Sequence, residues 1–125
     1  MNSNYIIIVL GEPYSIFSEI IEKYFYKKKK FKKYVVLIGN ISLLKKQINK
    51  LKYNISFNVI KDLKNAKANS VNIININFTY KKVFSKITNQ SSNYIEKCFD
   101  LSLKLIKNNK NKCILINGPI SKKTF

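Results

Sequence analysis

Histidine, arginine and tryptophan are absent from this 125-residue chain. Glycine occurs only three times and proline only twice. Without histidine, the chain cannot supply histidine-based acid–base catalysis or a histidine-ligated metal site. Without arginine, it lacks the planar, bidentate group that is typical of guanine and phosphate recognition. The glycines form neither a GxGxxG nor a Walker A pattern, so the sequence carries no recognisable nucleotide-binding loop.

Long apolar runs and paired cysteines are missing as well. No run approaches the roughly 18 residues that span a bilayer, and the first residues lack the basic region that opens a signal peptide. Cys98 and Cys113 lie in apolar surroundings without CxxC spacing, a pattern typical of buried, reduced thiols in a cytoplasmic protein. We therefore expect a cytoplasmic protein with no membrane partner.

Lysine, by contrast, is abundant. All basic residues are lysines, 24 of them against six acidic residues, which gives a net charge of +18. The segment from Tyr24 to Tyr34 interleaves lysines with aromatic residues, which can bind single-stranded nucleic acid through charge and stacking. The same composition is more typical of a solvated helix end and loop. The absence of arginine argues against nucleic acid as a partner, and a lysine-rich module that binds nucleic acid or an anionic surface is kept as the alternative.

Apolar periodicity divides the chain into alternating strands and helices. Residues 5–10 and 34–38 are continuous apolar runs closed by turn residues, as buried strands are. A helical period begins at Ser15 and again near Asn93, which forms a capping-box pattern with Glu96. A further helix is expected over residues 42–51, and further strands over 55–60, 71–78 and 113–116. The strands over 55–60 and 71–78 are expected nearer a sheet edge, and the order predicts an α/β protein, an α/β/α sandwich with a mostly parallel sheet.

The first predicted helix carries a broad apolar stripe. Two rows of residues spaced four apart form it: Ile16, Ile20 and Tyr24, and Phe17, Ile21 and Phe25. Such a stripe is expected to cover the sheet.

Two turns combine glycine, proline and a charged residue, and each follows a strand that we expect to be buried. Their loop positions are Gly11, Pro13, Gly118 and Pro119, and their charged members are Glu12 and Lys122. In an open parallel sheet, both turns would lie at the carboxyl edge, where ligands bind. Amides at the start of a following helix suit an anionic group. Glu12 and Lys122 are therefore the substrate-site candidates, although ordinary connections between strand and helix have a similar composition.

At these turns the sequence resembles the 4-hydroxythreonine-4-phosphate dehydrogenases. Members of that family open with a strand followed by Gly-(Asp/Glu)-Pro-Ala-Gly-Ile-Gly-Pro-Glu-Ile, and residues 11–20 read GEPYSIFSEI. The family's next strand ends in Gly-Asp, and residues 35–40 read VVLIGN. A helix bearing a tyrosine, here Tyr94, precedes a strand that ends Thr-(Ala/Gly)-Pro-(Ile/Val)-(Asn/His)-Lys, and residues 117–122 read NGPISK. Departures from the family pattern include Tyr14, Ser15, Phe17, Ser18, Asn117 and Ser121.

The resemblance implies a fold like that of isocitrate and isopropylmalate dehydrogenases and a homodimeric full-length enzyme. It also implies NAD-dependent oxidation and decarboxylation of a phosphorylated small molecule, 4-phosphooxy-threonine, in vitamin B6 biosynthesis. The implied cofactors are NAD and a divalent metal, Zn, Mg or Co. The family's metal-binding histidines and its Gly-His-Thr-Glu motif have no counterpart before residue 125, so no catalytic residue and no metal ligand can be carried over. Residues 1–125 are therefore expected to form a single, incomplete α/β domain, the N-terminal part of a longer dehydrogenase, truncated after a final strand and turn and inactive alone. A remnant without function is a further interpretation.

Overall fold

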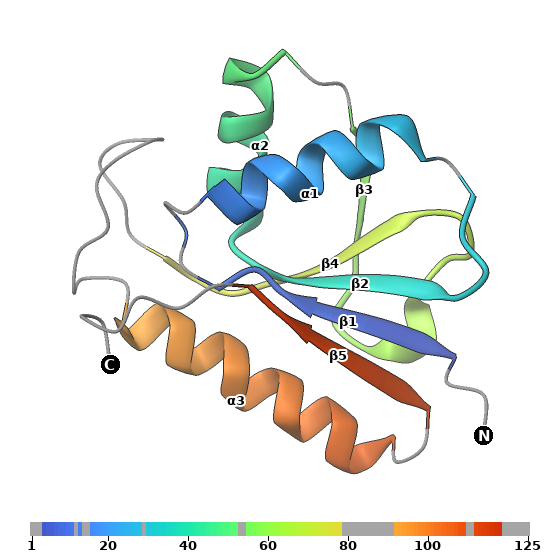
Figure 1. Ribbon diagram of the computed structural model, residues 1–125. Coiled ribbons are helices and arrows are strands. Elements are labelled where there is room, and N and C mark those ends of the chain that lie inside the picture. The colour runs from blue at the N-terminus through green and yellow to red at the C-terminus, as the bar shows by residue number, and fades with distance from the viewer. Residues whose placement is uncertain are drawn as a thin grey trace.

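The computed structural model describes residues 4–11, 13, 16–28, 30–52, 55–78, 92–109 and 112–118, and only the backbone of residues 16–18 and 92. Figure 1 shows a twisted sheet with helices on both faces. In chain order the elements are β1 (Tyr5–Val9), α1 (Ile16–Lys27), β2 (Tyr34–Gly39), α2 (Ile41–Lys50), β3 (Phe57–Val59), a short 3-10 helix η1 (Leu63–Asn65), β4 (Val71–Asn75), α3 (Ser92–Asn108) and β5 (Cys113–Asn117). The predicted α/β/α sandwich is thus confirmed.

All strand pairs of the sheet are parallel, and the strand order is β3-β4-β2-β1-β5. β2 and β1 are buried because both of their faces are covered, which explains their nearly continuous apolar sequences. β3 lies at an edge, as expected. Residues 71–78 were expected nearer an edge, and β4 lies between the edge strand β3 and the central strand β2, with Val71 to Ile74 buried.

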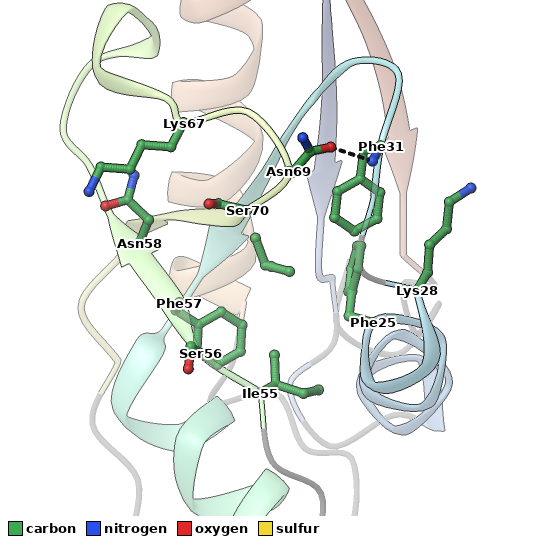
Figure 2. A pocket seen from close by; sticks show the side chains of 11 residues that line it. Phe25, Lys28, Phe31, Ile55, Ser56, Phe57, Asn58, Lys67, Asn69 and Ser70 are labelled. Carbon is green, nitrogen blue, oxygen red and sulfur yellow. Dashed lines mark hydrogen bonds between the residues drawn. The ribbon is translucent and has the colours of Figure 1, made fainter.

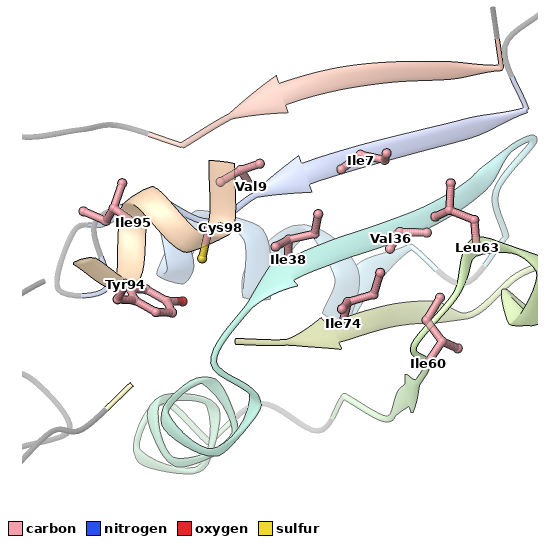
Figure 3. Packing of buried hydrophobic residues seen from close by; sticks show 10 residues of the cluster. All are labelled: Ile7, Val9, Val36, Ile38, Ile60, Leu63, Ile74, Tyr94, Ile95 and Cys98. Carbon is pink, nitrogen blue, oxygen red and sulfur yellow. The ribbon is translucent and has the colours of Figure 1, made fainter. Parts of the chain in front are cut away.

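The hydrophobic core has two parts, one on each face of the sheet. The alternation of side chains along a strand turns Ile7 and Val9 toward α3 and Ile8 toward α1 and α2. Figure 3 shows the α3 part of the core, where Tyr94, Ile95 and Cys98 pack on the sheet. The opposite part includes Phe25 of α1 and two α2 residues, Leu44 and Ile48.

The apolar stripe predicted for α1 is only half covered. Ile21 and Phe25 turn inward, whereas Ile20 and Tyr24 are 52% and 50% exposed. The other predicted members, Ile16 and Phe17, have side chains outside the described part. The expectation that the whole stripe covers the sheet is therefore wrong for its first row, where Ile20 and Tyr24 face outward.

The last strand also departs from expectation. β5 was expected to be buried, but it is an edge strand whose Ile114 and Ile116 are 42% and 43% exposed. α3 begins at Ser92, one residue before the predicted cap Asn93, so that residue lies in the first helical turn. Cys98 is a buried free thiol, and Cys113 is a half-buried one.

Among the described residues, no helix is both long enough and apolar enough to cross a bilayer.

Candidate functional site at the carboxyl edge of the sheet

The described beginnings of the two Gly-Pro turns lie next to each other. β1 and β5 are neighbours in the sheet, with Val9 opposite Asn117. The backbone amide of Gly118 donates a hydrogen bond to the carbonyl of Val9, with an N–O distance of 2.7 Å. Gly11 follows two residues after Val9, so both turns start at the same carboxyl edge. Three of the predicted site positions lie outside the described residues, and their role stays a prediction: Glu12, Pro119 and Lys122.

The first turn is fixed to α2. Gly11 has a φ of 73°, in the left-handed region that favours glycine. The carbonyl of Pro13 accepts a hydrogen bond of 3.0 Å from Nε2 of Gln47, whose side chain is buried. This contact holds the turn in one position relative to the helix, because buried polar groups keep their hydrogen bonds.

The end of β2 is packed too closely for any side chain at Gly39. A Cβ there would lie 2.5 Å from Cδ1 of Leu10 and 3.0 Å from the hydroxyl of Tyr94. The next residue, Asn40, caps α2 by accepting a hydrogen bond of 2.9 Å from the amide of Leu43. Glycine is therefore favoured here by close approach, and asparagine by the helix start.

Tyr94 of α3 and the end of β4 complete the hydrogen-bonded frame. The hydroxyl of Tyr94 accepts a bond of 2.8 Å from the amide of Asn40, although the two residues are 54 positions apart. The side-chain amide of Asn40 donates to the carbonyl of Ile76 at 2.9 Å, and Oδ1 of Asn75 accepts from the amide of Ile41 at 2.9 Å. The carboxyl ends of β2 and β4 are thus joined to both helical layers.

This frame is packed, with little free volume. A void of about 10 Å³ lies between the first turn, α2 and Tyr94, which is about the volume that one water molecule needs. A ligand at this edge would therefore lie above the frame and contact the turns themselves.

A larger cavity, of about 500 Å³, lies at the opposite, amino edge of the sheet (Figure 2). Phe25, Phe31 and Phe57 contribute aromatic walls, and Lys28 and Lys67 contribute positive charge. The loops around it are joined by a hydrogen bond of 2.9 Å from the amide of Phe31 to Oδ1 of Asn69. Because ligands of open parallel sheets bind at the carboxyl edge, this cavity does not belong to the predicted site.

Two buried ionisable groups have strongly shifted pKa values. Burial raises the pKa of the Cys98 thiol to about 12, against a smaller lowering by a hydrogen bond from Tyr94. Cys98 is therefore a protonated core residue at neutral pH, not a nucleophile. Burial, together with the charge of Glu19, raises the pKa of Glu22 on α1 to about 7. Among the described residues, neither carboxylate oxygen of Glu22 has a hydrogen-bond partner, which is a costly arrangement for a charged group.

The described residues do not fit the divalent metal that the resemblance implies. No three histidine, cysteine, aspartate or glutamate side chains come together in the part of the chain that the structure describes, and the sequence has no histidine. We derive no chemical step through a metal at this edge.

The sequence reasoning missed the residues that build the frame. Asn40 had a readable signal, since asparagine after a strand and before an apolar helical period is a typical N-cap. Tyr94 was noted only for its place at the start of a helix, and Gln47 and Asn75 gave no local signal, because their partners are distant in sequence.

Comparison with known proteins gives solved structures as matches. No protein-family model matches the chain, and no curated protein sequence matches it. A Salmonella typhimurium protein assigned to the 4-hydroxythreonine-4-phosphate dehydrogenases superposes with a TM-score of 0.82 at 18% identity. The corresponding dehydrogenase of Klebsiella pneumoniae gives 0.79 at 16% identity, and that of Burkholderia phymatum gives 0.81 at 13% identity.

Each superposition covers 98% of this chain but only 38–39% of the other protein. Identities in this range show a shared fold. The resemblance seen in the sequence is therefore confirmed in three dimensions, and the chain has the fold of part of these dehydrogenases.

Proposed function

We propose that the chain is part of an NAD-dependent 4-hydroxythreonine-4-phosphate dehydrogenase. One observation carries the proposal: the turns that begin at Gly11 and Gly118 start side by side, from the paired strands β1 and β5. These are the two segments in which the sequence resembles the family. Their common edge is the ligand-binding edge of open parallel sheets.

The proposed roles follow from the charges of the two turns. The ammonium group of Lys122, together with turn amides, would bind an anionic group of 4-phosphooxy-threonine, either its phosphate or its carboxylate. Glu12 would accept a hydrogen bond from a hydroxyl or ammonium group of the same substrate. In the complete enzyme, NAD would accept a hydride from the hydroxyl-bearing carbon of the substrate while the hydroxyl gives up its proton, and the β-keto acid so formed would release carbon dioxide. The groups that bind NAD and metal would come from protein beyond this portion, and in its complete form the enzyme would be a cytoplasmic homodimer.

The test is reconstitution of turnover. The chain would be co-expressed with the Klebsiella pneumoniae enzyme from which the superposed region has been deleted, and the co-purified complex assayed for NADH with 4-phosphooxy-threonine and magnesium. The deleted enzyme combined with its own missing segment serves as the positive control. We expect no turnover by the chain alone and measurable turnover by the complex.

Two variants test whether the second turn contributes to turnover. Lys122→Met should abolish most of the turnover of the complex, whereas Lys64→Met, at an exposed position on η1, should leave it unchanged. Turnover by the chain alone, or an inactive complex beside an active positive control, would contradict the proposed function. Equal turnover by Lys122→Met and the parent would contradict the role of the second turn.

A further inference from the structure

An uncovered apolar face lies where α1 passes the edge strand β5. Four side chains on this side are between two-fifths and just over one-half exposed: Ile20, Tyr24, Ile114 and Ile116. The two isoleucines of β5 occupy alternate positions, so both point to the α1 side of the sheet. Exposed apolar residues are common singly, but a continuous group on one edge of a sheet is typical of an interaction surface.

Beneath this face is a cavity of about 820 Å³. Its apolar lining includes Ile6 and Ile8 of β1, Ile21 and Phe25 of α1, and Ile116 of β5. Protein interiors are close-packed and contain few voids larger than a water molecule. A cavity of this size, open at the sheet edge, therefore has room for several apolar side chains from another segment.

The backbone of β5 is open on the same side. In the described part of the chain, β5 pairs with β1 and with no other strand (Figure 1). An edge strand of this kind presents a row of unpaired amide and carbonyl groups, which favours the addition of another strand. The apolar cavity and the open backbone are continuous, so one extended segment could satisfy both.

The positive charges around the cavity favour an acidic partner over a second copy of this chain. Lys28, Lys30, Lys32 and Lys33 line its end at the amino edge of the sheet, and the chain as a whole carries a net charge of +18. Two copies of the chain would bring like charges together at this end, whereas an acidic partner would be attracted to it.

We propose that this face binds a separate polypeptide segment that adds a strand to β5, places apolar side chains under α1 and directs acidic residues toward the four lysines of the cavity. The inference concerns assembly and goes beyond the proposed function, since it does not depend on any substrate.

The test uses labelled peptides and fluorescence anisotropy. One peptide of about ten residues, the upper length of ordinary strands, would alternate isoleucine with threonine and end in three glutamates. A second would carry three lysines in place of the glutamates. We expect the acidic peptide to bind at least roughly tenfold more tightly than the basic one, a difference of about 1.4 kcal/mol.

Variants at the two edges of the sheet distinguish binding at this surface from non-specific binding of the peptide. Ile116→Lys should weaken binding of the acidic peptide roughly tenfold, because it places a charge in the apolar cavity. Val59→Lys changes a residue of similar exposure (55%) on β3, at the opposite edge, and should leave binding unchanged. Circular dichroism would verify that both variants are folded.

Four results would overturn the proposal. The first is equal affinity for the acidic and basic peptides, and the second is equal loss of binding in both variants. The third is displacement of the peptide by laurate at a ratio of one to one. The fourth is a dimer, detected by sedimentation, that the Ile116→Lys substitution dissociates. The third result would assign the cavity to a small amphiphile, and the fourth would assign the face to a second copy of the chain.

Discussion

Replacing Glu22 with glutamine should stabilise the protein by about 3 kcal/mol at pH 8 and by only about 1 kcal/mol at pH 5. The Glu22 side chain is 1% exposed, and in the part of the chain that the structure describes neither of its carboxylate oxygens has a hydrogen-bond partner. Glutamine has nearly the same shape but stays neutral, so the variant removes the buried charge and little else. A protonated glutamate and a glutamine leave similar polar groups unpaired, and this part of the cost cancels.

The magnitude follows from the shift in pKa. Burial raises the pKa of Glu22 from 4.5 to about 7 in the folded protein. The folded state therefore binds the proton more tightly, and the stability of the parent falls as the pH rises from 4.5 to 7. At about 1.4 kcal/mol for each tenfold change in proton affinity, the loss approaches about 3 kcal/mol above pH 7. Glu22→Gln should recover about this amount at pH 8.

Urea unfolding followed by circular dichroism would measure the effect at pH 5, 6, 7 and 8. With a slope of about 1.5 kcal/mol per molar urea, the midpoint at pH 8 should rise by about 2 M. Glu96→Gln, on the exposed side of α3, is the control and should keep the parent's difference between pH 5 and pH 8. The reasoning fails if Glu22→Gln is no more stable than the parent at pH 8, or if it retains the parent's pH dependence.

Three further predictions concern the frame and the charge. Gly39→Ala should lower the unfolding free energy by about 1–3 kcal/mol, because its new Cβ overlaps Leu10. An unchanged thermal unfolding midpoint would contradict the close packing at this position. Tyr94→Phe should cost about 1–3 kcal/mol by leaving the buried amide of Asn40 unpaired, and hydrogen exchange at that amide should rise; unaltered exchange would contradict the contact. Single-stranded DNA should be retarded by the +18 chain only at low salt, because non-specific phosphate contacts weaken steeply as salt rises; submicromolar binding at 150 mM salt would favour the alternative of a nucleic-acid module.

The central part of the fold could be predicted from the sequence because local pattern and final environment agree there. β1 and β2 are covered on both faces, so their apolar runs read directly as buried strands. α2 was located to within one residue by its period and by the glycine and asparagine before it. The parallel arrangement followed from the alternation of strands and helices.

The edges of the molecule could not be predicted in this way. The sequence of β5 is as apolar as that of a buried strand, and only its place in the sheet leaves Ile114 and Ile116 exposed. Periodicity identifies an apolar stripe on α1, but it does not show which row has a partner. The hydrogen bond between Tyr94 and Asn40 joins residues 54 positions apart, and no local pattern marks such a pair. Both turns were expected at the carboxyl edge of the sheet. The pairing of β1 with β5 places Gly11 and Gly118, the first residues of the two turns, at that edge.

The most direct test of the proposed site is a titration of the isotope-labelled chain with 4-phosphooxy-threonine, followed through its backbone amides by NMR. We predict shifts at Gly11, Gly118 and the turn residues that follow them, with none at Asn69 and Ser70 beside the amino-edge cavity. The shifts should disappear in Lys122→Met. Shifts confined to the amino-edge cavity, or none at millimolar substrate, would contradict a substrate site at the carboxyl edge.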